Sequence, residues 1–187
     1  MPVSAVEQRL VGGECHFWGC VPSKMMIRAG NLLAEGRRVP GMAGASAIFP
    51  DWAPVALRIR EATHSWNDKA AADRFTNMGG TLYRGHGTIT GPASVSIGDS
   101  VLTARRGIVI GTGTAPLIPP LDGLVGTPYW TTRQAMEADQ IPRSLIVLGG
   151  GQAGVELARS SPGSAPPSPS SRRPVGCCRR TSRKPAN

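Results

Sequence analysis

The spacing of apolar residues predicts alternating strands and helices in the first part of the chain. Residues 3–7 form a short apolar run that ends in an acid and is followed by Gly12-Gly13, as expected of a buried strand and a loop. Residues 23–35 repeat apolar side chains at helical spacing, and residues 55–78 support a second helix that ends at Gly79-Gly80. The expected packing positions are Met26, Ala29, Leu32, Leu33, Val55, Leu57, Ile59, Ala62, Trp66 and Ala70.

After residue 80 the apolar period changes to two. Residues 81–84, 94–97 and 101–110 predict strands, with a tight turn at residues 98–100. A connection rich in glycine and proline follows, and the apolar run 144–148 predicts a strand that leads into GGGQAGVELA, where a helix begins. The pattern indicates an α/β protein with a β-rich meander inserted between two strand–loop–helix units.

Composition adds limits to this picture. The chain has 187 residues, enough for one ordinary domain or for pieces of two. It contains no run of about 18 apolar residues, and its first residues lack the charged and apolar regions of a signal peptide. We therefore expect a cytoplasmic protein without a membrane span.

The positive charge is concentrated at the C-terminal end. Seven of the 21 Lys and Arg residues lie in residues 159–187, and no acid follows Glu156. The net charge of the whole chain is +9. The residues before that segment include 14 basic and 12 acidic ones, so their net charge is only +2. The segment is expected to be a disordered basic tail. Nucleic-acid binding through this tail is a remote alternative.

Cys15 and Cys20 stand close together in the stretch GGECHFWGCVPSK. In a cytosolic protein such a pair is more often redox-active or metal-binding than structural. A zinc site is disfavoured because C-x2-C half-sites are missing and the three histidines show no ligand spacing. No metal site is therefore predicted, and two unrelated buried cysteines remain the simple alternative to a redox pair.

The same stretch resembles the redox-active disulfide motif of the class I pyridine nucleotide–disulfide oxidoreductases, a family that includes dihydrolipoamide dehydrogenase, glutathione reductase and mercuric reductase. It departs from the family pattern in Glu14, where threonine is usual, and in the aromatic residues 16–18. The resemblance implies that Cys20 faces the flavin as the charge-transfer thiolate, that Cys15 is the interchange thiol, and that Lys24 lies beside the flavin ring. A thiolate is stabilised near a helix N-terminus, and Pro22 fits the first turn of such a helix.

The resemblance extends over residues 3–158 and implies two cofactors, FAD and NAD(P). In the FAD part, Glu7 would hold the ribose and Gly87 would meet the adenine. The segment with Thr112, Gly113 and Thr114 would touch FAD again. The G-x-G-x-x-G pattern in the NAD(P) part would place a pyrophosphate at a helix N-terminus. Its residues are Gly149, Gly151 and Gly154, and Glu156 in the following helix is also a cofactor-binding candidate.

By resemblance, the fold consists of partial FAD- and NAD(P)-binding Rossmann-like domains. Residues 1–142 would form a partial FAD-binding domain without its first glycine-rich loop. Residues 143–158 would begin the NAD(P)-binding domain, and residues 159–187 would be the tail. Read in a frame shifted by one base, residues 164–172 permit an apolar strand that ends in an acid. A frameshift near Glu156 would then explain the tail, and a natural disordered tail is the alternative.

The implied reaction passes electrons from NAD(P)H through FAD to the Cys15–Cys20 disulfide and on to a small-molecule or protein disulfide, or runs in reverse as in dihydrolipoamide oxidation. Family members are homodimers, but we expect the dimerisation domain and its His-Glu acid–base pair to be missing. No histidine follows His86. An inactive truncated remnant, or a weak nucleotide binder, is therefore the alternative.

Overall fold

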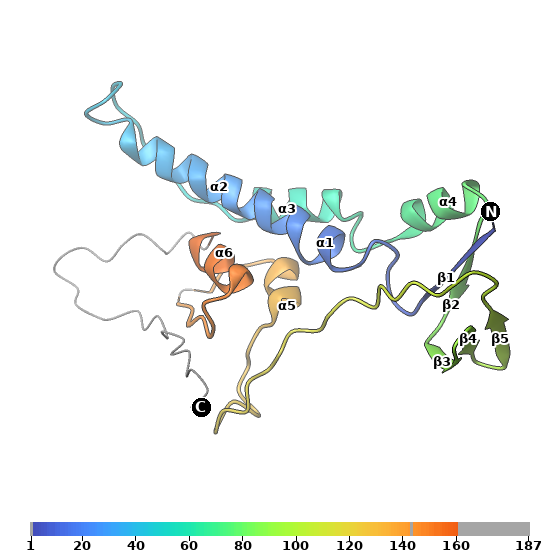
Figure 1. Ribbon diagram of the computed structural model, residues 1–187. Helices are drawn as coiled ribbons and strands as arrows, with labels where there is room; N and C mark the ends of the chain where they lie inside the picture. The colour runs from blue at the N-terminus through green and yellow to red at the C-terminus, as the bar shows by residue number, and fades with distance from the viewer. Residues whose placement is uncertain (1, 143, 161–187) are drawn as a thin grey trace, which may run out of the picture.

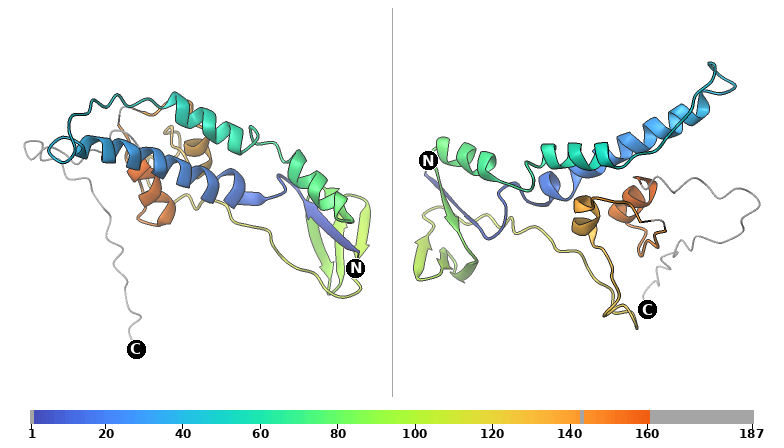
Figure 2. Two further views of the ribbon diagram at one scale, coloured as in Figure 1. Left: turned by 90° about the horizontal axis from the view of Figure 1, so that it is seen from above. Right: turned by 180° about the vertical axis from the view of Figure 1, so that it is seen from behind.

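The computed structural model describes residues 2–142 and 144–160. The elements are β1 (Val3–Glu7), α1 (Gly13–Phe17), α2 (Cys20–Arg38), α3 (Ala53–Ala62), α4 (Lys69–Asn77), β2 (Gly80–Arg84), β3 (Gly87–Gly91), β4 (Ser94–Ile97), β5 (Ser100–Thr103), α5 (Thr132–Glu137) and α6 (Gln152–Ser160). Strands gather at one end of the molecule and the long helices extend from the other, as Figures 1 and 2 show. Within the described residues, no helix is both long and apolar enough to cross a membrane.

A pair of parallel strands connects the start of the chain to its middle. β1 pairs with β2 in register, with Val3 opposite Gly80 and Glu7 opposite Arg84. Parallel neighbours require a crossover, and α1 to α4 provide it. β3, β4 and β5 form a separate antiparallel sheet in sequential order. The sequence predicts a meander here but not its first strand, β3, and the predicted strand 81–84 belongs to the parallel pair instead. The carboxyl ends of β1 and β2, at Glu7 and Arg84, therefore lie at the same edge of the parallel pair.

The helices pack around a small core next to the cysteine motif. α3 lies along α2, and α6 packs against α2 as well (Figures 1 and 2). Met26 of α2, Ile59 of α3 and Met136 of α5 are buried together. Because Ile59 is 0% exposed, it marks the centre of this core. Partly buried side chains that pack against it are Trp18, Met25, Trp52, Val55, Trp66 and Leu157.

The expected helix over residues 55–78 is wrong as a single element. It is divided into α3 and α4, and His64, Ser65 and Trp66 between them all have positive φ, from 50° to 56°. Left-handed backbone in three successive residues other than glycine ends a helix. The α3 end is also closed by Thr63, whose hydroxyl donates to the carbonyl of Ile59 at 2.8 Å.

Two predicted strands differ from the structure. The strand expected over residues 101–110 ends at Thr103, and residues 144–148 form no strand. Ile146 is 86% exposed. A strand forms only where a neighbouring strand bonds its backbone, and the described part of the chain places none beside residues 144–148. The remaining predicted strands, β1, β2 and β4, and the helix after the glycine loop are confirmed. The expectation that residues 3–7 are buried is wrong, because β1 is exposed at its start and only partly buried at its end.

Some expected packing positions face solvent. Leu32 is 47% exposed and Leu57 is 55% exposed, whereas Met26 and Ile59 on the same helices are buried. Ala70 is also exposed. The helices are thus covered along narrower faces than the apolar pattern predicts.

Residues 104–131, here called the connecting segment, contain neither helix nor strand. In Figure 1 the segment runs from β5 beneath the helices, turns back and leads to α5. Val109 is 97% exposed and Leu117 is 91% exposed. The expected tail begins at residue 159, but residues 159 and 160 belong to α6, and Ser160 is buried there. The rest of it, residues 161–187 with Cys177 and Cys178, lies outside the described residues.

Candidate redox-disulfide site

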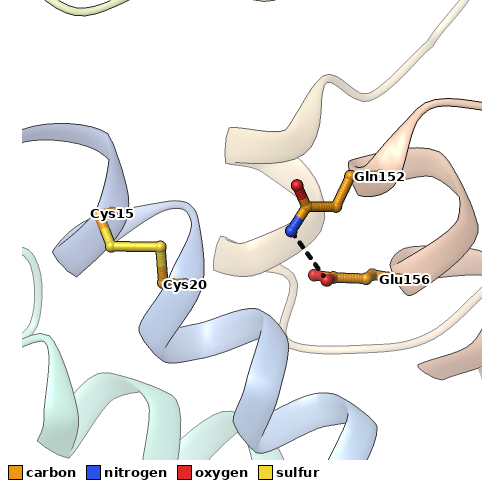
Figure 3. Close-up of a disulfide and its surroundings, with 4 residues drawn as sticks. All are labelled: Cys15, Cys20, Gln152 and Glu156. Carbon is orange, nitrogen blue, oxygen red and sulfur yellow. Dashed lines mark hydrogen bonds between the residues drawn. A yellow bond between two sulfur atoms is a disulfide. The ribbon is translucent and has the colours of Figure 1, made fainter.

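Cys15 and Cys20 form a disulfide between two consecutive helices (Figure 3). Their Cα atoms are 4.7 Å apart, within the range of ordinary disulfides. Both residues are exposed, Cys15 within α1 and Cys20 as the first residue of α2. An exposed disulfide can be reached by an incoming thiolate, which thiol–disulfide exchange requires.

The residues around the cysteines explain this local fold. Gly12 and Gly13 have φ of 113° and 60°, so the chain turns into α1 through left-handed backbone. Phe17 is 1% exposed and anchors α1 in the interior. A Cβ at Gly19 would lie 3.0 Å from the carbonyl oxygen of Glu14, so glycine lets the two cysteine-bearing turns approach closely.

The N-terminus of α2 supplies the electrostatics that the sequence predicts for Cys20. α2 begins at Cys20 and continues for 19 residues, with Pro22 buried in its first turn. The unpaired N–H groups at a helix N-terminus stabilise a nearby anion. The structure thus confirms the helix position of Cys20, and a thiolate formed there would be stabilised.

α6 brings Glu156 to the start of α2. In Figure 3, Gln152 and Glu156 project from α6 toward this region, and the amide of Gln152 donates to Glu156 at 3.3 Å. A hydrogen bond from Ser23 is the main cause that lowers the pKa of Glu156, with Gln152 and the charge of Lys24 adding to it. An ionised Glu156 therefore lies near Lys24, one turn beyond the redox pair.

α5 also contacts the motif, which the sequence did not lead us to expect. Arg133 donates to the carboxylate of Glu14 at 2.9 Å, and its guanidinium carbon lies 4.5 Å from the centroid of the Trp18 ring. The indole of Trp18 donates to Glu137 at 2.7 Å. A sequence signal for α5 does exist, because Thr131 and Gln134 form a capping box.

At the carboxyl end of the parallel strands, the residues before and at Gly87 pack against the end of β1. The N–H of Gly85 donates to the carbonyl of Glu7, and a Cβ at Gly87 would lie 3.0 Å from the side chain of Val6. The carboxylate of Glu7 accepts from the N–H of Arg9 at 2.7 Å. An acid at the carboxyl end of a parallel strand fits a nucleotide ribose.

A partly buried acid, Asp68, fixes the loop that connects β1 to the cysteine motif. Asp68 is 13% exposed and accepts from the N–H of Val11 at 2.6 Å and from the guanidinium of Arg84 at 2.7 Å. Burial raises the pKa of Asp68, but the hydrogen bonds and charge of Arg84, together with the N–H of Val11, outweigh it and lower the pKa. Arg84 also donates to the carbonyl of Arg9 at 3.1 Å.

The remaining cofactor candidates form two groups on loops, except that Gly154 already lies in α6. Thr112, Gly113 and Thr114 are exposed in the connecting segment, where Gly113 has φ of 68°. In the second loop Gly149 has φ of 105°, and a Cβ at Gly154 would overlap the carbonyl oxygen of Gly149. Glycine at these two positions thus permits the tight turn into α6 that a phosphate loop needs.

Known proteins resemble nearly the whole described chain. The model of the family described as pyridine nucleotide-disulphide oxidoreductase matches residues 1–161. Mercuric reductase from Acidithiobacillus ferrooxidans is 33% identical over 169 residues, which cover 84% of this chain and 30% of that protein. Mercuric reductase from Shigella flexneri is 32% identical, with 84% and 29% covered. The chain thus spans about a third of the length of these relatives.

A solved structure shows the same fold. The HOCl-induced flavoprotein disulfide reductase RclA from Escherichia coli superposes with a TM-score of 0.69 at 22% identity, covering 86% of this chain and 34% of that one. The expected α/β, Rossmann-like fold is confirmed. By its match to the family model, the chain belongs to the pyridine nucleotide-disulphide oxidoreductases.

Proposed function

We propose that this chain carries the disulfide-bearing, FAD-facing part of a flavin-dependent NAD(P)H:disulfide oxidoreductase. The observation that carries the proposal is the exposed Cys15–Cys20 disulfide at the N-terminus of α2, with α6 packed beside it. Residues 1–142 would serve FAD, and residues 143–158 would begin the NAD(P) part. When bound, FAD and NAD(P)H supply the hydride chemistry and the two electrons.

The two cysteines divide the work of exchange. Two electrons and two protons convert the disulfide to two thiols. The Cys15 thiolate then attacks an acceptor disulfide, forming a mixed disulfide and releasing one acceptor thiol. The Cys20 thiolate, stabilised by the start of α2, attacks Cys15, restores the intramolecular disulfide and releases the second thiol.

The other site residues would bind and orient the cofactors. Glu7 would bond the FAD ribose, and Gly87 lets the backbone approach the adenine beside β1. The exposed segment with Thr112, Gly113 and Thr114 would add a second FAD contact. Lys24, near the ionised Glu156, would lie beside the flavin ring. The residues that would hold the nicotinamide cofactor's pyrophosphate at the start of α6 are Gly149, Gly151 and Gly154.

The acceptor is proposed to be a small-molecule or protein disulfide. Mercuric ion is a second candidate, because both curated relatives described above are mercuric reductases and paired thiolates bind soft metal ions. A disulfide that is reduced and reformed in each cycle fits the reducing cytoplasm, which is the proposed location. The proposed assembly is a homodimer, as in the family.

A flavin titration of the purified full chain tests the proposal. FAD should bind stoichiometrically, NADH or NADPH should bleach the visible flavin band without oxygen, and an added aromatic disulfide should restore it. Cys15→Ser should abolish the last step and leave FAD binding intact. The matched control replaces Cys177 and Cys178 by serine and should change none of these steps.

A nucleotide binder without turnover is the second candidate for the isolated chain. The exposed apolar side chains of the connecting segment favour it, because such surfaces are normally covered in a working protein. This candidate predicts weak FAD binding and no bleaching by NAD(P)H. Failure of FAD to bind at all would overturn both candidates.

A further inference from the structure

The two unusual features of the cysteine motif are both engaged by α5. Glu14 pairs with Arg133 at 2.9 Å, and Trp18 lies between Arg133, 4.5 Å from the ring centroid, and Glu137, which accepts from the indole at 2.7 Å. Arg133 and Glu137 are four residues apart and thus share one face of α5. One face of α5 therefore contacts Glu14, which precedes Cys15, and Trp18, which follows it.

The position of α5 is fixed by its own contacts, so the position of the Arg133 side chain is defined as well. The capping box of Thr131 and Gln134 sets the start of the helix, and Met136 is 3% exposed in the core. Beyond the helix, the indole of Trp52 donates to the carbonyl of Ala138 at 2.9 Å. Because the side chain of Arg133 is only 23% exposed and that of Glu14 is 32% exposed, water and salt screen their pairing less than at an open surface.

The pairing matters to the neighbouring sulfur. Glu14 directly precedes Cys15 in α1, and an unpaired negative charge in the neighbourhood of a thiol disfavours the thiolate. The thiolate is the form that attacks a disulfide. A cation held on Glu14 removes this penalty without itself having to contact the sulfur.

We propose that Arg133 is a positioning residue for the redox pair, which neutralises Glu14 and so keeps the Cys15 thiolate available for exchange. The proposal deepens the disulfide-exchange function and rests on it. It also assigns a purpose to the departure of Glu14 from the family pattern, since Glu14 and Arg133 act as one unit.

Other charged groups around the motif stay the same in the comparison. They are Lys24 on α2, Glu137 on α5 and Glu156 on α6. The titratable His16 and the thiol of Cys20 are also unchanged. The substitutions at Glu14 and Arg133 alter none of them. Differences between variants at Glu14 and Arg133 therefore report on that pair alone.

The test measures how fast iodoacetamide alkylates Cys15 in the dithiothreitol-reduced full chain as pH rises, with tandem mass spectrometry separating Cys15 from Cys20. Arg133→Gln should slow alkylation at about pH 7 by roughly threefold, because the thiolate fraction falls more than its nucleophilicity rises. Near pH 10, where the thiolate is fully formed, the rate should not fall. Arg133→Lys should restore most of the rate at pH 7.

The double variant Glu14→Gln/Arg133→Gln distinguishes charge from shape. Without the carboxylate, loss of the cation should matter little, and the rate should return to within about twofold of the original. Arg28→Gln is the matched control, because it breaks an exposed pair with Glu35 on α2, 3.5 Å apart. That variant should leave the alkylation profile unchanged.

Two results would overturn the proposal: an unchanged profile in Arg133→Gln, or a double variant that remains as slow as the single one. If Arg133→Gln does not fold, Glu14→Gln decides, since the unpaired cation should then speed alkylation about threefold at pH 7. An unchanged or slower rate in Glu14→Gln would refute the idea. The measurement needs neither FAD nor NAD(P)H, so failure of the wider function would appear separately, in the flavin titration.

Discussion

The surroundings of the disulfide and the connecting segment differ in how many tertiary contacts fix them and in how far they are exposed to solvent. Around the disulfide, distant parts of the chain meet through polar contacts, such as Trp18 with Glu137 and Trp52 with Ala138. In the connecting segment Val109 and Val125 are 97% and 95% exposed. The redox pair therefore lies in a site built by tertiary packing. Thr112, Gly113 and Thr114, which are cofactor candidates from the sequence alone, lie in an exposed segment without regular structure.

This difference separates two kinds of functional residue. A disulfide that must open and close in place needs neighbours that stay fixed, and α2, α3, α5 and α6 supply them. A loop that meets a cofactor through its backbone can be ordered when the cofactor binds, at the cost of conformational entropy. Stability changes should therefore be large in the first region and small in the second.

Truncation of the core should have the largest effect. Ile59→Ala should lower the free energy of unfolding by about 2–5 kcal/mol, because Ile59 is 0% exposed between Met26 and Met136. Urea unfolding followed by circular dichroism measures it. Leu117→Ala, at a position 91% exposed, should change stability by less than about 0.5 kcal/mol. Equal losses would show that the connecting segment is packed in solution.

Removal of the Asp68 charge should come next. Asp68→Asn should cost about 1–3 kcal/mol at neutral pH, since it weakens the bonds to Arg84 and Val11. The folded-state pKa of Asp68 is lowered, so its contribution is present above the unfolded value, about 3.9, and is lost as pH falls through the folded-state pKa. Unfolding curves for both proteins should thus converge at low pH.

The control for Asp68 is Asp73→Asn. Asp73 pairs with Lys69 at 2.6 Å, but its side chain is 53% exposed. Its loss should cost less than about 0.5 kcal/mol. A larger cost than that of Asp68→Asn would contradict the assigned role of the partly buried acid.

Substitution in the second glycine loop should act on binding. Gly154→Ala places a Cβ onto the carbonyl oxygen of Gly149, an overlap that costs about 1–3 kcal/mol and should raise the Kd for NADPH about tenfold. Fluorescence titration measures it. In Gly150→Ala the added Cβ meets nothing within 4 Å, so the Kd should stay within about twofold. Equal weakening would argue against a phosphate site formed by the turn.

Loss of the α5 cap should have the smallest effect. Thr131→Ala removes the capping hydroxyl and should lower the unfolding free energy by about 1 kcal/mol. Thr112→Ala, on the open segment, should change it by less than about 0.5 kcal/mol. Thermal unfolding of the two variants side by side measures the difference. A null result for Thr131 would mean that α5 is held by Met136 and Trp52 alone.

The sequence predicted the elements whose signals are local. β1, β2, β4 and the helix of the cysteine motif follow from apolar spacing and glycine placement. The break at residues 64–66 has no glycine or proline to announce it. The strand expected over residues 144–148 depends on neighbours that periodicity cannot report.

The candidate site divides in the same way. The disulfide could be predicted because Cys15 and Cys20 share one motif with recognisable flanks. The pairing of Glu14 with Arg133 joins positions 119 residues apart, and neither side chain has a distinctive local pattern. Only the folded structure shows that Glu14, which departs from the family pattern, forms an ion pair with Arg133.

The sequence separation between Glu14 and Arg133 also means that the two residues are synthesised at different times. A ribosome adding about 5–20 residues per second exposes the cysteine motif roughly 6–24 seconds before α5, which lies 119 residues later. During that interval Cys15 and Cys20 meet the thiols of the cell with Glu14 unpaired. The nascent chain should therefore carry a less reactive Cys15 than the finished protein, and translation of α5 would switch on its full exchange chemistry.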